Sequence, residues 1–310
     1  MNKTVPRYSV LCCPKCQLTL KKVVESYYCS ECKKNYSIAG GIIRLIPSFT
    51  EDLKLSILKW DKIYFNQLTN ESYYDEYQFY KKTYLKDTLT QLHHAKHLTK
   101  NDVYLEIGCG SFFLGQSIAS EVGLIIGIDM CPSALIIAKK MLDKNKVKNY
   151  ILIQGDIMNM PIKNNVIDLV YGGGVIEHFN NTQKCVNELF RVLKKGGVSF
   201  NTVPYLNIGS LTYRQVWGNI PNVPLLRQIF EFIHLKILGG KHMIFGYEMS
   251  FLSSTLISIH KAAKFKKISV EKFDVQTIFE FLPPAIRPIF IWLANNSRLF
   301  WPMIKVVAQK

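Results

Sequence analysis

One segment, residues 103–110 with the sequence VYLEIGCG, constrains the fold of this 310-residue chain more than any other. Its apolar start is typical of a strand that is buried on both faces of a parallel sheet. The run then breaks into Gly108-Cys109-Gly110, where a left-handed turn or a closely approaching ligand favours glycine. Asp129 ends a second apolar run about twenty residues later, where nucleotide-binding sheets place an acceptor for ribose hydroxyls. Together these features predict a nucleotide-type site.

Strand and helix patterns alternate regularly from residue 101 onward. The pattern predicts strands at 103–107, 124–128, 150–154, 166–171 and 198–203, and helices at about 113–121, 132–145 and 182–194. Such alternation indicates an α/β fold with a doubly wound, mostly parallel sheet that helices flank on both faces. The segments 264–273 and 303–308 have the pattern of two further strands.

Residues 1–48 hold two Cys-x-x-Cys pairs separated by twelve residues, namely Cys13 with Cys16 and Cys29 with Cys32. Two such pairs can complete a closed four-sulfur zinc site, whereas a disulfide framework, the alternative, fits adjacent pairs of this kind poorly. Four protein ligands leave no open position for a substrate, so the expected role of the zinc is structural. With its closing Leu45-Ile46-Pro47, the segment resembles the zinc-ribbon family typified by the small activator subunit of certain tRNA and protein methyltransferases.

Two further parts complete the expected organisation. Residues 49–100 read as a helical linker that is rich in aromatic side chains. It could cover a ligand as a lid or simply pack, and packing is the commoner role of such a stripe. Residues 101–310 form the main domain, with an insertion at about 205–247 that holds Trp217, Phe230, Phe232, His234, His242 and Phe245.

The order of motifs in the main domain resembles that of class I S-adenosylmethionine-dependent methyltransferases. The motifs are Glu106-x-Gly108-x-Gly110, Asp129, Gly155-Asp156-Ile157, Asp168 to Tyr171, Val175 to His178, and Leu193 to Gly197. The resemblance covers about residues 101–203 and is closest to the subgroup that modifies small molecules, lipids, quinones and sugars. It implies a Rossmann-like sheet of seven strands, in which the last two segments make the antiparallel end.

The resemblance also implies which residues bind the cofactor, S-adenosylmethionine. Its amino-acid end would face Glu106, its ribose hydroxyls would bind an aspartate, and its adenine would meet residues at the ends of the second and third strands. The implied set is Glu106, Gly108, Gly110, Asp129, Met130, Asp156 and Ile157. Either aspartate on its own could instead be a helix cap or a turn residue.

Phe112 departs from the family pattern, because that position usually holds a third glycine. The departure suggests a shortened or re-routed turn, and it leaves open a non-catalytic protein that uses the ribbon as a docking surface.

The residues after the fourth strand bear on the chemistry of transfer. His178 and Glu177 fall at the carboxyl edge of the predicted sheet, where ligands bind, and either could act as a base or contact the substrate; the alternative is simple packing. Methyltransferases that act on exocyclic amines of bases have Asn/Asp-Pro-Pro-Tyr here. This chain has Gly172-Gly173-Gly174, which favours an O or C acceptor on a small or lipid-linked molecule.

Composition leaves the partner open. The net charge of +16 suits nucleic acid, anionic lipid or a phosphorylated substrate, or only a lysine-rich solvated surface. An rRNA or tRNA methyltransferase is therefore an alternative, although the apolar C-terminal half opposes it. Residues 281–301 could lie on an anionic membrane surface or pack as a helical pair. The start of the chain lacks a signal-peptide core and no apolar run could span a membrane, so the expected location is cytoplasmic, with at most peripheral membrane contact.

Overall fold

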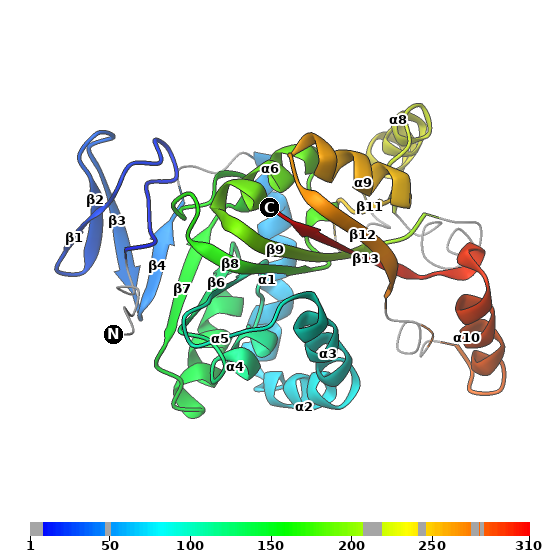
Figure 1. Cartoon of the computed structure of the whole chain (residues 1–310), viewed down its shortest axis with the longest axis horizontal. Helices are drawn as coiled ribbons and strands as arrows, with labels where there is room; N and C mark the ends of the chain where they lie inside the picture. The colour runs from blue at the N-terminus through cyan, green and yellow to red at the C-terminus, as the bar shows by residue number, and fades with distance from the viewer. Residues whose placement is uncertain (1–8, 47–50, 207–218, 241–245, 274–278, 280–281) are drawn as a thin grey trace. The chain divides into compact units, whose positions relative to one another are not determined.

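The computed structural model describes residues 9–46, 51–206, 219–240, 246–273, 279 and 282–310 (Figure 1). The chain divides into two compact units. The first comprises residues 1–172, 187–199 and 310, and the second comprises residues 173–186 and 200–309. The domain boundaries expected at 48 and 100 stay predictions, and Trp217, His242 and Phe245 of the expected insertion lie outside the described residues.

The first unit is built on a sheet whose strand order is β1-β2-β3-β4-β7-β6-β5-β8, followed by the first half of β9 (Leu193–Pro204). β5 (Val103–Ile107), β6 (Leu124–Asp129) and β7 (Tyr150–Gly155) pair in parallel, and β8 (Ile167–Gly173) pairs in parallel with β5. Every residue of β5, β6 and β7 is buried, as expected for parallel strands covered on both faces.

Helices cover this sheet. Figure 1 shows α4 (Phe113–Ile118) and α5 (Pro132–Lys144) on one face, with α2 (Tyr73–Thr83) and α3 (Leu85–Ala95) beside them. Tyr73 of α2 is buried against α5, and the ring of Tyr77 lies 5.1 Å from that of Phe113. Much of the aromatic stripe in residues 49–100 therefore packs onto α4 and α5.

The cysteine-rich segment forms four strands that continue the same sheet. β1 (Lys21–Val23), β2 (Ser26–Cys29), β3 (Lys34–Ala39) and β4 (Ile42–Leu45) pair in antiparallel order. β4 then pairs in parallel with β7, from Ile42 opposite Leu152 to Leu45 opposite Gly155. The segment thus covers the backbone groups that β7 would otherwise expose as an edge strand. Sequence patterns had not indicated this pairing.

The second unit contains the second half of β9, then β13 (Met303–Gln309) and β12 (Lys266–Phe273), in that strand order. β12 and β13 pair antiparallel, so both predicted C-terminal strands and the antiparallel end are confirmed. β10 (Ile220–Pro221), inside the expected insertion, pairs in parallel with β11 (Met249–Ser250), which follows it. The described helices include α8 (Leu226–Glu231), the π-helix η4 (Phe232–Ile237), α9 (Ser253–Ala262) and α10 (Arg287–Asn296). None of the helices in the described ranges is long and apolar enough to cross a membrane.

Candidate active site

The glycine loop after β5 has the left-handed geometry that its sequence predicts. Gly108 and Gly110 have φ angles of +53° and +51°, which side-chain-bearing residues adopt at a cost. Space is restricted as well, because a Cβ atom on Gly110 would lie 2.5 Å from the hydroxyl oxygen of Tyr64. Tyr64 comes from α1 (Glu51–Thr69), so this helix reaches the glycine loop.

Asp129, the last residue of β6, is fixed by two backbone amides. Its Oδ2 accepts a hydrogen bond from Gly110 N at 2.8 Å, and its Oδ1 accepts one from Cys131 N at 2.8 Å. Burial raises the pKa of this carboxyl above its ordinary value. Because each carboxylate oxygen has a second lone pair, Asp129 can still accept from a ligand while the amides hold its orientation.

Glu106, the fourth residue of β5, is a buried acid with no cation beside it among the residues that the structure describes. The side chain is only 7% exposed, and the hydroxyl of Tyr104 donates to its Oε2 at 2.9 Å. Burial raises the pKa of Glu106 to about 8, and the other groups that act on it are Tyr104, the backbone of Gly115 and the carboxyl of Asp129. A ligand with a cationic group would relieve this burial of an acid.

Asp156 and Ile157 follow β7 in a tight turn. Asp156 caps the 3₁₀ turn Ile157–Asn159: its Oδ1 accepts from Met158 N at 2.8 Å and its Oδ2 from the Asn159 amide at 2.9 Å. The cap role that the sequence left open for Asp156 is therefore present. In the β6–β7 ladder Asp129 lies opposite Gln154, so the ends of the two strands bring the loops after them together.

Met130, expected beside the adenine, is tied to β7. Its carbonyl oxygen accepts a hydrogen bond from the amide nitrogen of Gln154 at 3.1 Å, and its side chain is partly buried. The backbone beside Asp129 is thereby held against the neighbouring strand.

Phe112 occupies the position of the missing third glycine in a left-handed conformation, with φ +58° and ψ +35°. The side chain is 1% exposed. Its ring fills the space above two glycines: a Cβ atom on Gly115 would overlap the ring, and one on Gly127 would lie 3.3 Å from its Cδ1. Glycine is therefore required at positions 115 and 127, which contact the ring, and not at position 112. α4 still begins at the next residue, Phe113.

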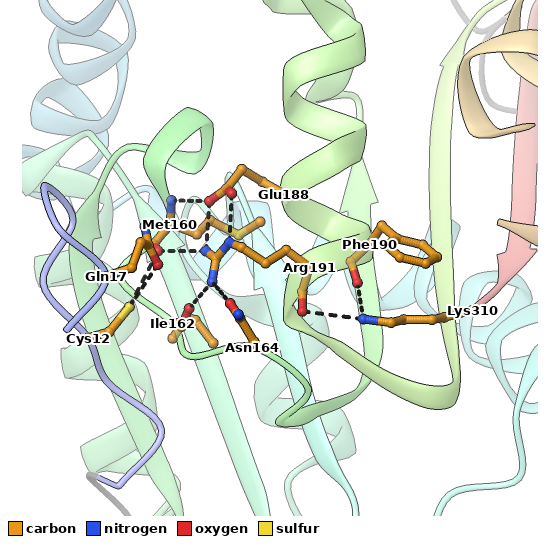
Figure 2. A network of polar contacts seen from close by, with 9 residues as sticks. All are labelled: Cys12, Gln17, Met160, Ile162, Asn164, Glu188, Phe190, Arg191 and Lys310. Carbon is orange, nitrogen blue, oxygen red and sulfur yellow. Dashed lines mark hydrogen bonds and ion pairs between the residues drawn. The ribbon is translucent and has the colours of Figure 1, made fainter. Parts of the chain in front are cut away.

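Arg191 anchors the loop that follows the Asp156 turn (Figure 2). Its guanidinium donates to the carbonyl oxygens of Met160 and Ile162, at 2.9 and 2.6 Å, and to the side chain of Asn164 at 2.8 Å. Glu188 pairs with the guanidinium at 2.7 Å and accepts from Met160 N at 2.8 Å. The network thus fixes both backbone groups of Met160.

The cysteine-rich segment joins the same loop. Cys12 N donates to the carbonyl of Pro161 at 3.0 Å, Lys163 N donates to the carbonyl of Val10 at 2.8 Å, and the Cys12 thiol lies 3.9 Å from the carbonyl of Met160. Burial raises the pKa of Cys12 to about 12, so it stays a neutral thiol in this contact. The segment and Arg191 hold the loop from two sides.

The four paired cysteines come together as their spacing predicts. The sulfur atoms of Cys13, Cys16, Cys29 and Cys32 all lie within 4.8 Å of one another, and two pairs are 3.5 and 3.9 Å apart. A tetrahedral zinc ion with Zn–S bonds of about 2.3 Å requires S–S separations of about 3.8 Å. The donor set therefore fits one zinc ion, and it is the only group of three or more such donors in the described ranges.

The two catalytic candidates lie in the second unit, in the 3₁₀ turn Ile176–His178, whereas all seven cofactor-binding candidates lie in the first. Nδ1 of His178 is 2.7 Å from the carbonyl oxygen of Tyr247. Because a carbonyl only accepts, this contact places a proton on Nδ1 and leaves the lone pair of a neutral ring on Nε2. Glu177 is 2% exposed.

Residues 98–207 match a family described as "Methyltransferase domain". A demethylmenaquinone methyltransferase of Lactiplantibacillus plantarum is 24% identical over 205 residues, which cover 61% of this chain and 79% of that protein. The enzyme of the same name from Lactobacillus johnsonii is 30% identical over 128 residues, which cover 38% and 52%. The solved structure of Haemonchus contortus phosphoethanolamine N-methyltransferase 2, with S-adenosylhomocysteine, superposes with a TM-score of 0.51 at 19% identity, covering 73% of this chain and 52% of that one.

The chain carries a class I S-adenosylmethionine-dependent methyltransferase domain. The predicted fold class, cofactor and enzyme class are thereby confirmed. The individual site residues stay predictions, but the methyltransferase domain offers what the cofactor needs. A sulfonium ligand with an α-amino group suits Glu106, the buried acid without a cation, and the ribose hydroxyls suit the fixed carboxylate of Asp129.

Sequence reasoning missed several parts of this site. Tyr64 lies at Gly110, and the carboxylate of Asp61 accepts from Ser133 N at 2.8 Å at the start of α5. Arg191 was not singled out either. Each of these contacts joins residues that are far apart in the chain, and no local motif marks them.

Proposed function

We propose that this methyltransferase transfers a methyl group from S-adenosylmethionine to an O or C atom of a small or lipid-linked acceptor. The observation that carries the proposal is the fixed pair of glycine loop and Asp129, joined by the hydrogen bond from Gly110 N to Oδ2. Glu106 would receive the α-amino group, and Met130, Asp156 and Ile157 would surround the adenine. The demethylmenaquinone methyltransferases among the relatives support an acceptor of this class.

The chemistry asks little of the protein beyond position. The cofactor supplies a methyl group that is already activated by a sulfonium. The acceptor atom attacks the methyl carbon in line, the carbon–sulfur bond breaks with its electrons going to sulfur, and S-adenosylhomocysteine leaves. A hydroxyl or acidic carbon must also lose its proton. We assign that proton to Nε2 of His178, because the Tyr247 carbonyl leaves Nε2 as the basic nitrogen, and Glu177 is the second candidate for base or substrate contact.

Exposed apolar side chains support a lipid-linked acceptor and peripheral contact with an anionic membrane surface. On α10, Trp292 is 63% exposed and Ile289 is 56% exposed, which favours the surface role over the packed role for the described part of 281–301. On α8 and η4, Ile229 and Phe232 are 45% and 60% exposed. Helices that expose apolar side chains can insert them into a membrane surface, and the net charge of +16 would attract that surface if its lipids are anionic. The cytoplasmic location stays a prediction.

Titration with S-adenosylmethionine tests the site. Asp129→Ala should abolish measurable binding by calorimetry, because both loop orientation and ribose contact depend on that carboxylate. Asp143→Ala is the matched control: its side chain is 50% exposed and pairs with Lys139 on the outer side of α5, so its affinity should match that of the wild type. Unchanged affinity in Asp129→Ala would overturn the site assignment.

The acceptor can be identified with methyl-labelled cofactor. We expect label in an extracted lipid or small-molecule fraction, and formation of S-adenosylhomocysteine only when that fraction is added. Label in rRNA or tRNA would instead establish the RNA alternative, with binding that falls steeply as salt rises. Cofactor binding without turnover on any fraction would favour the non-catalytic scaffold.

A further inference from the structure

The second unit contains a broad surface groove of about 750 Å³ whose lining includes none of the residues assigned to methyl transfer. Ligand sites usually have volumes of roughly 300 to 1,000 Å³. One wall is the start of α6 (Thr182–Val192) with Asn180 and Asn181 before it, the second runs from Asn222 to Arg227, and the third is a face of α9. Three separate segments of one unit therefore border an open groove of ligand size.

The lining is dominated by amide and hydroxyl groups. Asn180, Asn222, Ser254, Thr255 and Ser258 all line the groove. Their side chains hydrogen-bond to no other protein group in the described ranges. Amides and hydroxyls both donate and accept, so they match a ligand whose own groups do the same.

The groove carries no net positive charge for an anion. Among the described residues that line it, the single cation is Arg227, which donates from Nε to Glu231 at 2.8 Å and from a terminal nitrogen to the carbonyl of Asn180 at 3.0 Å. The described lining also contains two apolar residues, Pro224 and Ile259, against eight polar ones. A phosphate group or a flat quinone ring would leave most of these polar groups unmatched.

We propose that this groove binds a glycosyl group, whose hydroxyls pair with the free amides and hydroxyls while one ring face covers the apolar positions. The groove is also connected to the candidate base. Glu231 accepts from the hydroxyl of Tyr247 at 2.6 Å, and the carbonyl of Tyr247 is the partner of His178. Arg227, which lines the groove, is thus linked to His178 through Glu231 and Tyr247.

The inference rests on the proposed function in one respect only: if the chain methylates as proposed, its acceptor carries a sugar. Occupation of the groove itself does not depend on methyl transfer. Binding and transfer can accordingly be tested apart.

Saturation-transfer NMR on the full zinc-loaded chain tests the groove, with the methyl glycosides of glucose, galactose, N-acetylglucosamine and rhamnose as probes. Thr255→Trp places a large side chain in the groove. Lys261→Trp is the control, since it adds the same side chain to an exposed position on α9 that does not line the groove. Circular dichroism and calorimetry with S-adenosylmethionine establish that both variants are folded.

We expect saturation transfer to at least one glycoside in the wild type and in Lys261→Trp, and at least a tenfold weaker affinity in Thr255→Trp. Asn222→Ala, a smaller change, should lower the affinity for the same glycoside severalfold. Absence of transfer to all four glycosides at millimolar concentration, or equal transfer in Thr255→Trp, would overturn the proposal. Glycoside binding without label transfer from the cofactor would refute only the proposed acceptor.

Discussion

The anchoring of residues 160–164, the loop after the Asp156 turn, by Arg191 gives a prediction whose size can be worked out from the structure. Arg191→Met keeps the length and apolar stem of the side chain but removes its hydrogen bonds to Met160, Ile162 and Asn164. It also leaves Glu188 without its cation. The side chains of Arg191 and Glu188 are only 19% and 15% exposed, so the ion pair is largely shielded from water.

Removing one partner of a fully buried ion pair costs about 3–5 kcal/mol. This pair keeps some contact with water, so the cost should be somewhat smaller. We expect Arg191→Met to lower the free energy of unfolding by roughly 2–4 kcal/mol. The loop directly follows the turn that contains Asp156 and Ile157, the two predicted adenine contacts. If this turn contacts the cofactor as proposed, the loss of one of its hydrogen bonds to the cofactor, worth about 1 kcal/mol, should weaken the binding of S-adenosylmethionine about fivefold.

Urea denaturation and calorimetric titration measure the two effects. Lys195→Met is the control, since it removes a nearby exposed positive charge without touching the loop. Arg191→Lys should recover part of the stability but not all, because an ammonium cannot match the planar guanidinium fork. In a double-mutant cycle with Glu188→Gln, the two changes should show a coupling of about 1–3 kcal/mol. A loss below about 1 kcal/mol in Arg191→Met, together with unchanged cofactor affinity, would refute the anchoring role.

Three further outcomes are expected. Gly115→Ala should lower the free energy of unfolding by about 1–3 kcal/mol, since the added Cβ atom would overlap the ring of Phe112. In a double-mutant cycle with Phe112→Leu, this cost should largely disappear because the ring is gone. Additive effects of the two substitutions would contradict the explanation. The pKa of Glu106 rises from its ordinary 4.5 to about 8 on folding, so between these pH values the folded chain holds a proton that the unfolded chain has lost. The free energy of unfolding should therefore fall, as pH rises through this range, by up to about 1.4 kcal/mol per pH unit. Urea denaturation at pH 5 and 8.5 should show the fall in the wild type and not in Glu106→Gln. Cys29→Ser should lower the zinc content measured by mass spectrometry by about one ion per chain, whereas Cys185→Ser, a buried cysteine outside the cluster, should keep it.

The sequence predicted the parallel strands because each is a local apolar run between turns. β5, β6 and β7 end within one residue of the predicted bounds. β8 extends to Gly173, past the predicted end at 171. The larger departure is β9, which begins at Leu193 and not at residue 198, so that α6 ends at Val192 and not at 194. Its Lys-Lys-Gly-Gly run has the composition of a helix end, but Gly196 N donates to the carbonyl of Lys310, and Lys310 N to the carbonyl of Gly197. A pairing between residues more than a hundred positions apart leaves no local signal.

The candidate site divides along the same line. Gly108, Gly110 and Asp129 could be found because the turn and the acid sit at fixed distances from consecutive strands. Two other contacts depend on how helices pack, so only the structure shows them. They are the contact of Tyr64 with Gly110 and that of Arg191 with residues 160–164. The same holds for the pairing of β4 with β7. A zinc ribbon could be recognised from its cysteines, but not its place in the sheet.

Phe112, the one clear departure from the family pattern, takes its left-handed position because its ring is accommodated by neighbouring glycines. A left-handed conformation costs a side-chain-bearing residue about 1–2 kcal/mol, whereas burying a phenylalanine ring contributes about 1.5–3 kcal/mol. The second effect offsets the first only if the ring has room, and Gly115 and Gly127 provide that room. The hydrogen bond from Gly110 N to Oδ2 of Asp129 also stays intact at 2.8 Å, so Phe112 leaves the contact between the glycine loop and Asp129 in place.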